Sequence, residues 1–272
     1  MKQQSPAKKF ILNNIIYIAF VVMLIGLSFV APSFLTVNNM INVLRQATVV
    51  GVLAMGMTYV IISGGIDLSV ASTIALASCI AAAYSTTSTA IPLILAVGLG
   101  CLAGMAVGAV NGIVISYLGV TPFIATLGMQ YAVRGIALVY TGGRPINALT
   151  NAYKGIGQGY VGFVPVPVIL FIVIALIAWF FLSKTKFGRY IYAIGGNEQA
   201  ALVSGLRVKR IKFTAYVING LTAALAGIIL SARVAVGSPT AGESYDLLAI
   251  TAVVVGGTSN QGGTGGILPS VI

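Results

Sequence analysis

The sequence predicts an all-α fold, a polytopic transmembrane helical bundle with discontinuous helices. The first reason is composition: 58% of the 272 residues are apolar and only 7% are charged, whereas soluble domains carry roughly a quarter charged residues. A soluble fold of this length could not bury so much apolar side chain, because surface grows almost as fast as volume. The second reason is the 33 glycines, since small residues let membrane helices approach one another closely.

Apolar runs of about 20 residues are long enough to cross a bilayer as helices. The chain contains seven such runs, at roughly 13–31, 46–63, 68–84, 91–117, 122–141, 165–182 and 212–232. An eighth run, about 246–256, is too short to cross alone. The longest polar connections are 32–45, 142–164 and 184–211, and these must lie in water or against protein because irregular backbone cannot face lipid. We interpret residues 1–272 as a single transmembrane domain.

The formal net charge of +11 comes from short basic segments beside the apolar runs. Such segments orient membrane proteins, and little surface remains for nucleic acid, so we expect no nucleic-acid partner. Three basic residues lie in the first dozen and seven lie between Lys184 and Lys212. If the N-terminus is cytoplasmic, alternation of the spans puts these ten inside and three outside, at Arg45, Arg144 and Lys154. Positive charge favours the inside, so we predict a cytoplasmic N-terminus and a cytoplasmic 184–211 loop.

Glycine and proline interrupt the apolar pattern at several points. Ser63-Gly64-Gly65 ends the second span, Thr121-Pro122 separates the fourth from the fifth, and 256–266 holds six glycines in eleven residues. Broken helices at membrane depth usually mean that backbone groups line a cavity or the protein interior. Close packing of glycine-rich helices is the alternative explanation for the same residues.

Asp67 is the only carboxylate near the membrane interior before Glu198. An ionisable group at that depth is a candidate functional residue. Its alternative role is the N-cap of the third span, accepting from the backbone N–H of Ser69 or Val70. Both roles are compatible, because a cap at a helix break also shapes a pore.

Three more polar side chains lie within predicted spans. Asn111 and Asn219 are expected to bond to neighbouring helices. Arg134 can pack near a helix end or pair with a backbone carbonyl of a broken helix.

Nothing in the sequence predicts an enzyme. The chain has no His, no Cys with a base partner and no phosphate-binding G-x-x-x-x-G-K-[ST] loop. We therefore expect no catalytic residue, no metal and no cofactor. If ATP is used, another subunit binds it.

The 184–211 loop contains a short helix signal. Asn197 suits an N-cap, Glu198 complements the positive end of the helix dipole, and Gly205 suits a C-terminal stop. We predict about two turns of helix over Asn197–Ser204. A capped cytoplasmic helix between spans is an element that a partner protein can move.

Five motifs together resemble the permease subunits of monosaccharide (ribose-type) ABC importers. They are Gly64-Gly65-Ile66-Asp67-Leu68-Ser69-Val70-Ala71-Ser72, Thr121-Pro122-Phe123-Ile124-Ala125-Thr126-Leu127-Gly128, Gly188-Arg189-Tyr190-Ile191-Tyr192, Gly195-Gly196-Asn197-Glu198-Gln199-Ala200-Ala201 with Gly205, and Ala252-Val253-Val254-Val255-Gly256-Gly257-Thr258-Ser259. They occur in the family's order over essentially the whole chain.

The resemblance implies a subunit of the bacterial inner (plasma) membrane that moves a ribose-like or related monosaccharide into the cytoplasm by alternating access. It implies four partners besides the lipid membrane and the small sugar: two cytoplasmic ATP-binding subunits, a second permease copy or paralogue, and a periplasmic or surface sugar-binding protein. Helix breaks and the translocation path are assigned to Gly64, Gly65, Asp67, Ser69, Asn111, Thr121, Pro122 and Phe123. Coupling to the ATPase is assigned to Gly196, Asn197, Glu198, Ala200, Ala201 and Gly205.

The chain departs from the family pattern in two places. Ala71 stands where the family usually has glycine. Relatives continue past the Gly-Gly-Thr-Ser motif for about two more helices, so we expect that the last helices of the family are absent from a chain ending at Ile272. The alternatives are an ABC permease for branched-chain amino acids or nucleosides, an ion-coupled secondary transporter, and a membrane scaffold without transport. A secondary transporter usually needs intramembrane carboxylates, and Asp67 alone is a small supply.

Overall fold

The computed structural model describes residues 15–31 and 33–271 of the chain. It separates into two compact units, Met1–Leu44 and Arg45–Ile272. The first unit contains α2 (Ile15–Val30) and the beginning of α3 (Val37–Ile62). The three N-terminal lysines used to predict orientation, at positions 2, 8 and 9, and the first two residues of the predicted 13–31 span lie outside the described residues.

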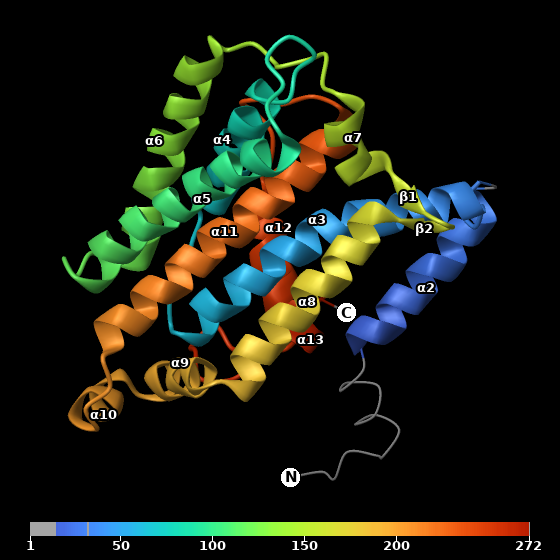
Figure 1. Cartoon of the computed structure of the whole chain (residues 1–272). Helices are drawn as coiled ribbons and strands as arrows, with labels where there is room; N and C mark the ends of the chain where they lie inside the picture. Colours follow the sequence, from blue (N-terminus) through green and yellow to red (C-terminus); the bar gives the residue numbers. More distant parts are fainter. Residues whose placement is uncertain (1–14, 32, 272) are drawn as a thin grey trace. The chain divides into compact units, whose positions relative to one another are not determined.

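The second unit continues α3 and holds the remaining elements (Figure 1). In chain order these are α4 (Val70–Ala83), α5 (Leu93–Ser116), α6 (Pro122–Thr141), α7 (Asn151–Gln158), β1 (Tyr160–Val161), β2 (Val164–Pro165), α8 (Val166–Lys184), α9 (Lys186–Gly196), α10 (Glu198–Val203), α11 (Val208–Val234), α12 (Tyr245–Val255) and α13 (Ile267–Val271). The two short strands pair antiparallel, with Tyr160 opposite Pro165.

The predicted all-α membrane bundle is confirmed. In the described part of the chain, α3, α5, α6, α8 and α11 are long and apolar enough to cross a membrane. Helix α4 differs from expectation: its 14 residues span only about 21 Å at 1.5 Å per residue, short of the ~30 Å hydrocarbon core. A helix this short cannot cross the hydrocarbon core by itself.

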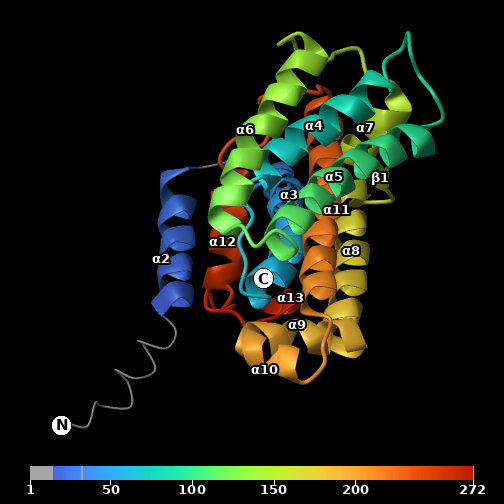
Figure 2. The ribbon, with the colours of Figure 1, turned by 90° about the vertical axis from the view of Figure 1, so that its left-hand side faces the viewer.

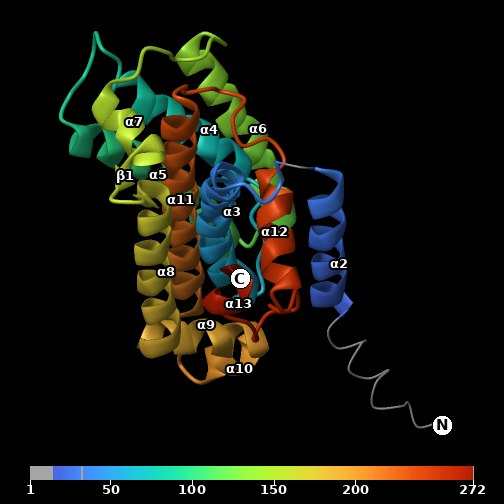
Figure 3. The ribbon, with the colours of Figure 1, turned by 90° about the vertical axis from the view of Figure 1, so that its right-hand side faces the viewer.

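The long polar connections contain more structure than hydropathy predicted. The 32–45 segment already includes the start of α3, 142–164 includes α7 and the strand pair, and 184–211 includes α9 and α10. Hydropathy detects contact with lipid, whereas these helices are set by caps; Thr150, for example, accepts from the Tyr153 amide at the start of α7. Helix α7 lies at one end of the bundle and α9 with α10 at the other, as Figures 1 and 3 show.

Helix α3 supplies the core of the second unit. Every residue from Gly51 to Ile62 is buried, and Figure 3 shows α3 between α11 and α12. Its apolar side chains pack with residues of α4, α11 and α12, and with partly buried side chains of α8. A helix that is apolar all round is expected to be enclosed by other helices in this way.

Helices α5 and α11 pack with their backbones in direct contact. Along α5, glycine recurs every fourth residue from position 100 to 112, so the glycines share one face. At Gly104 and at Gly220 of α11, a Cβ atom would overlap the other glycine's carbonyl oxygen. Small residues at such crossings permit backbone contact between membrane helices. This contact fixes the register of the asparagines that the two helices carry.

Arg134 of α6 donates hydrogen bonds to the segment that connects α11 to α12. Its Nη1 donates to the carbonyl oxygens of Pro239 at 2.7 Å and Ala241 at 3.0 Å. Its Nη2 donates to Ala71 O of α4 at 3.3 Å. The pairing with backbone carbonyls is therefore the role that the structure gives this arginine.

Candidate functional site: the α3–α4 break and the coupling segment

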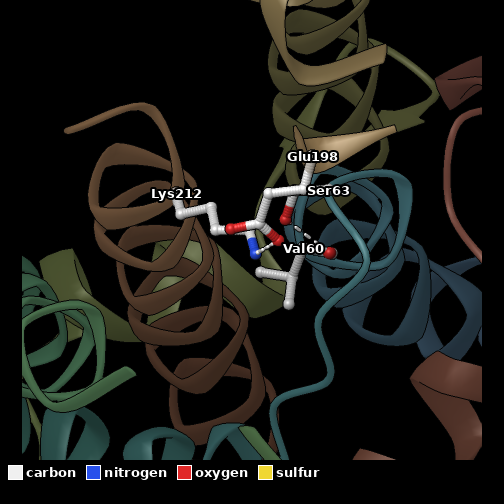
Figure 4. Close-up of polar contacts among 4 residues, drawn as sticks. All are labelled: Val60, Ser63, Glu198 and Lys212. Carbon is white, nitrogen blue, oxygen red and sulfur yellow. Dashed lines mark hydrogen bonds and ion pairs between the residues drawn. The ribbon is translucent and has the colours of Figure 1, made fainter. Parts of the chain in front are cut away.

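The break between α3 and α4 is a seven-residue turn, Ser63–Ser69. Gly64 has φ +78°, a left-handed conformation that glycine adopts without strain. Ser63 Oγ donates to Val60 O at 2.7 Å and so stays within the end of α3 (Figure 4). Helix α4 then begins at Val70, with Ser69 in the N-cap position.

Asp67 is the centre of a buried hydrogen-bond cluster within this break. The residue is 1% exposed. Oδ1 accepts from Ser69 N at 2.9 Å and from Ser69 Oγ at 2.6 Å, and Oδ2 accepts from Asn219 Nδ2 at 2.9 Å. The bond from the Ser69 amide is the one expected of a capping carboxylate, although Asp67 lies two residues before the N-cap position.

Two asparagines bring separate helices to this cluster. Asn111 of α5 donates to Ser69 Oγ at 2.7 Å and, at 3.4 Å, to Asp67 Oδ1. Asn219 comes from α11. Both asparagines are buried, and the Oδ1 atom of each has no hydrogen-bond partner in the described structure. Their amide groups are therefore committed to donating toward the Asp67 and Ser69 side chains.

The cluster stabilises a carboxylate by dipoles. Within the described residues, Asp67 has no cationic partner; the ion pair found there joins Lys212 and Glu198. Burying a charge without a counterion is costly unless hydrogen bonds satisfy it. Hydrogen bonds to an ionised acceptor are stronger than neutral ones. Asp67 therefore binds the break to α5 and α11 at once.

A tyrosine and the start of α6 complete the surroundings of the break. Tyr216, one turn before Asn219 on α11, donates from Oη to Ile66 O at 3.3 Å. Its ring packs with Val60 and Ile115, and Ala125 of α6 packs against the same group.

The predicted path residues thus fall into two groups. Gly64, Gly65, Asp67, Ser69 and Asn111 come together at the break. The Thr121-Pro122-Phe123 group lies at the start of α6, a turn before Ala125, and Phe123 is exposed. In the described structure these three residues form no hydrogen bond with Asp67.

The second candidate region is the coupling segment, which we define as residues 184–211 with α9 and α10. The Asn197 side chain accepts from the Ala200 amide at 2.9 Å, and Gly205 has φ +82°, so both ends of α10 are as predicted. Glu198 pairs with Lys212 at the beginning of α11, N–O distance 2.6 Å (Figure 4). Figure 2 shows α9 and α10 together at one end of the bundle.

The residues assigned to coupling do not all face solvent. Ala201 is buried and packs inward, while its neighbours Leu202 and Val203 are 56% and 88% exposed. Gly196 and Ala200 are exposed beside them. A partner that binds α10 from solvent would therefore meet two apolar side chains.

Sequence reasoning left several of these residues without a role in the site. Asn219 was expected only to bond a neighbouring helix, and Tyr216 and Leu202 drew no prediction. Lys212, Tyr216 and Asn219 of α11 are spaced by four and then three residues, so they lie on one face of the helix. This spacing was the sequence signal that could have placed Tyr216 and Asn219 together.

The arrangement provides a buried hydrogen-bond cluster and an exposed apolar face. No group of three His, Cys, Asp or Glu side chains that could hold a metal ion occurs in the described residues. The cluster fixes the α3–α4 break against α5 and α11, and the coupling segment presents a small apolar face at one end of the bundle.

Comparison with known proteins adds independent information. Residues 39–271 match the family described as branched-chain amino acid transport system / permease component. The chain is 41% identical to the ribose import permease protein of Haemophilus influenzae, over 97% of this chain and 82% of that relative. It is 46% identical to the ribose import permease protein of Bacillus subtilis, over 94% of this chain and 80% of the relative. It is 35% identical to the xylose transport system permease protein of Escherichia coli, over 88% of this chain and 76% of the relative. No solved structure matches the chain.

Proposed function

The chain belongs to the ribose-type family of ABC-importer permeases, multi-pass membrane proteins without catalytic chemistry of their own, and from this premise we propose that it carries ribose or a closely related monosaccharide into the cytoplasm. The observation that carries the proposal is the 41–46% identity to two ribose import permeases over more than nine tenths of the chain. Movement follows an alternating-access cycle in which the helices expose a polar path first to the outside and then to the cytoplasm.

An uncharged sugar suits the polar groups of the described spans. Asp67 is 1% exposed and its oxygens already accept from Ser69 and Asn219, so its carboxyl group is not open to a substrate. Hydroxyl, amide and backbone groups at the helix breaks supply weak, exchangeable hydrogen bonds. A permease of this kind needs only a weakly binding path, because a separate sugar-binding protein supplies affinity. We assign the Gly64–Ser69 break, Asn111 and the Thr121–Phe123 turn to the border of that path.

The energy comes from partner subunits. We place the coupling segment in the cytoplasm, because ten basic residues then lie inside and three outside. The exposed Leu202 and Val203 side chains of α10 suit an apolar groove on a cytoplasmic ATP-binding subunit. Two such subunits, a second permease chain and a sugar-binding protein make up the proposed assembly.

Labelled-sugar uptake tests the proposal. A bacterial strain that lacks its own ribose permease would express this chain together with the ATP-binding and sugar-binding subunits of the same genome. We expect uptake of labelled ribose that is inhibited by unlabelled ribose and, more weakly, by xylose or allose. Uptake equal to that of the strain without the chain would contradict the proposal.

Orientation has its own test. After replacement of Cys79 and Cys101 by serine, single cysteines are introduced at Thr150 and Ala200 and labelled with a membrane-impermeant maleimide. We expect labelling at position 150 from outside and at position 200 only after the cells are opened. The reverse pattern would overturn both the topology and the docking of α10.

A second substrate class is favoured by one observation. The matching family is described by branched-chain amino acid transport, so uptake of labelled leucine is measured in the same strain. Uptake of leucine without uptake of ribose would assign the chain to amino acids instead.

A further inference from the structure

Three backbone segments meet at the end of the bundle that carries the coupling segment. They are the end of α3 at Ile62, the end of α9 at Gly195, and the glycine-rich loop between α12 and α13 at Gly262-Gly263. Gly263 N donates to Ile62 O at 2.9 Å. A Cβ atom at Gly195 would overlap Ile62 O and come within 2.5 Å of Gly263 N. The segments therefore touch backbone to backbone, without intervening side chains.

Two further contacts hold the same junction together. A Cβ atom at Gly262 would lie 3.0 Å from both Gly195 O and Ile62 O. Tyr192, one turn before Gly196 on α9, donates from Oη to Gly265 O at 2.8 Å. Burial raises the pKa of Tyr192 above its ordinary value.

We propose that Gly195, Gly262 and Gly263 form an interlock that transmits movement of the coupling segment to the α3–α4 break. These glycines are positioning residues for energy coupling, a role that deepens the proposed function and rests on it. The sequence marked the 256–266 glycines as a break or as close packing, and named no contact between this loop and the end of α3.

The short path from the interlock to the buried cluster gives the physical reason. Ile62 is the last residue of α3, and Asp67 follows five residues later through the Gly64 turn. Helix α10, on which a partner would dock, begins at Glu198, only three residues after Gly195. Close-packed protein interiors transmit displacement rather than absorb it, and backbone-to-backbone contact leaves no side-chain rotamers to absorb the motion.

The test compares two helical glycines. Gly195→Ala inserts a methyl group against Ile62 O, whereas at Gly98 of α5 a Cβ atom would meet nothing within 4 Å, so Gly98→Ala is the matched control. The permease is purified in lipid nanodiscs with its ATP-binding subunits. ATP hydrolysis is measured with and without the ribose-loaded sugar-binding protein. We expect the Gly195→Ala complex to assemble and to keep its basal hydrolysis, while stimulation falls by about tenfold, the scale of a 1–3 kcal/mol overpacking penalty.

A second variant covers the case in which Gly195→Ala fails to insert. Tyr192→Phe removes only the hydroxyl that donates to Gly265 O and should lower stimulation by about threefold, the scale of one hydrogen bond. The ratio of stimulated to basal hydrolysis is the readout, because a purely structural defect would lower both rates together.

The outcomes separate the two hypotheses. Absence of ribose-dependent stimulation in the wild-type complex would overturn the proposed function and the interlock with it. Normal wild-type stimulation together with equal stimulation in Gly195→Ala and Gly98→Ala would overturn the interlock alone. Where Gly195→Ala does not insert, stimulation of Tyr192→Phe equal to wild type would overturn it. Loss of stimulation in Gly195→Ala with Gly98→Ala unchanged would support it.

Discussion

Removing the carboxylate of Asp67 should destabilise the chain in proportion to the donors left unpaired, not to the charge lost. In Asp67→Leu, the Ser69 amide and the Asn219 Nδ2 group lose their acceptor at a buried position. Each unsatisfied donor costs about 1–3 kcal/mol, so we expect a total loss of about 2–6 kcal/mol. The Ser69 hydroxyl is not counted, because it can rotate toward another acceptor.

Asp67→Asn should be far milder. Its Oδ1 can keep the Ser69 amide bond, and its new Nδ2 group faces Asn219. A half-turn of the Asn219 amide would present Oδ1, which has no partner in the native cluster, as the acceptor. The unpaired polar group is Asn219 Oδ1 before the change and Asn219 Nδ2 after it, so the number of such groups stays the same and the expected cost is about 1 kcal/mol.

A residue swap supplies the control. Asn219→Asp alone places two carboxylates where a 2.9 Å hydrogen bond now lies, and like charges at that distance repel strongly. The double variant Asp67→Asn/Asn219→Asp restores one carboxylate and one amide, and should recover most of the stability. Such a cycle isolates the pairwise term from the two single effects.

The assay is the temperature at which half of the detergent-solubilised protein remains monodisperse in size-exclusion chromatography. We expect the order wild type, Asp67→Asn, Asp67→Leu from most to least stable, with the double variant above Asn219→Asp. If Asp67→Asn is as unstable as Asp67→Leu, or the double variant is no better than Asn219→Asp, the hydrogen-bond account of the cluster is wrong.

Three further predictions use the same stability assay. Gly104→Val should prevent folding because its side chain would overlap Gly220 O, whereas Gly98→Val on the same helix meets open space and should fold; equal behaviour would refute the α5–α11 contact. Arg134→Gln should cost about 1–3 kcal/mol by leaving buried carbonyl groups underpaired, and no loss would mean that those bonds do not form. Glu198→Gln should change stability by under about 1 kcal/mol, because the side chain is 52% exposed and surface ion pairs contribute little; a large loss would indicate that α10 depends on the pair.

The sequence was informative wherever a local signal decided the structure. Apolar runs located the long membrane helices. Helix α10 begins at the capping side chain of Asn197 and stops before the left-handed Gly205, as these residue types predict. The acceptor role of Asp67 also followed from its place after two glycines. In each case the controlling interaction lies within a few residues along the chain.

The sequence was less informative where distant segments decide the outcome. The inward orientation of Ala201 depends on packing against α9, α11 and their neighbours, which a six-residue helix does not encode by periodicity. The pairing of Asn219 with Asp67 joins residues 152 positions apart. The glycine-rich 256–266 loop was identified as unusual, but its contact with Ile62 required the fold.

ATP-driven uptake into proteoliposomes tests the central claim most directly. The chain is reconstituted with its ATP-binding subunits, the sugar-binding protein and labelled ribose are added outside, and ATP is enclosed in the lumen. We predict ribose accumulation that requires lumenal ATP and the binding protein and is unaffected by collapsing proton and sodium gradients. Accumulation by the chain alone, driven by an imposed ion gradient without ATP-binding subunits, would contradict the assignment and identify an ion-coupled transporter.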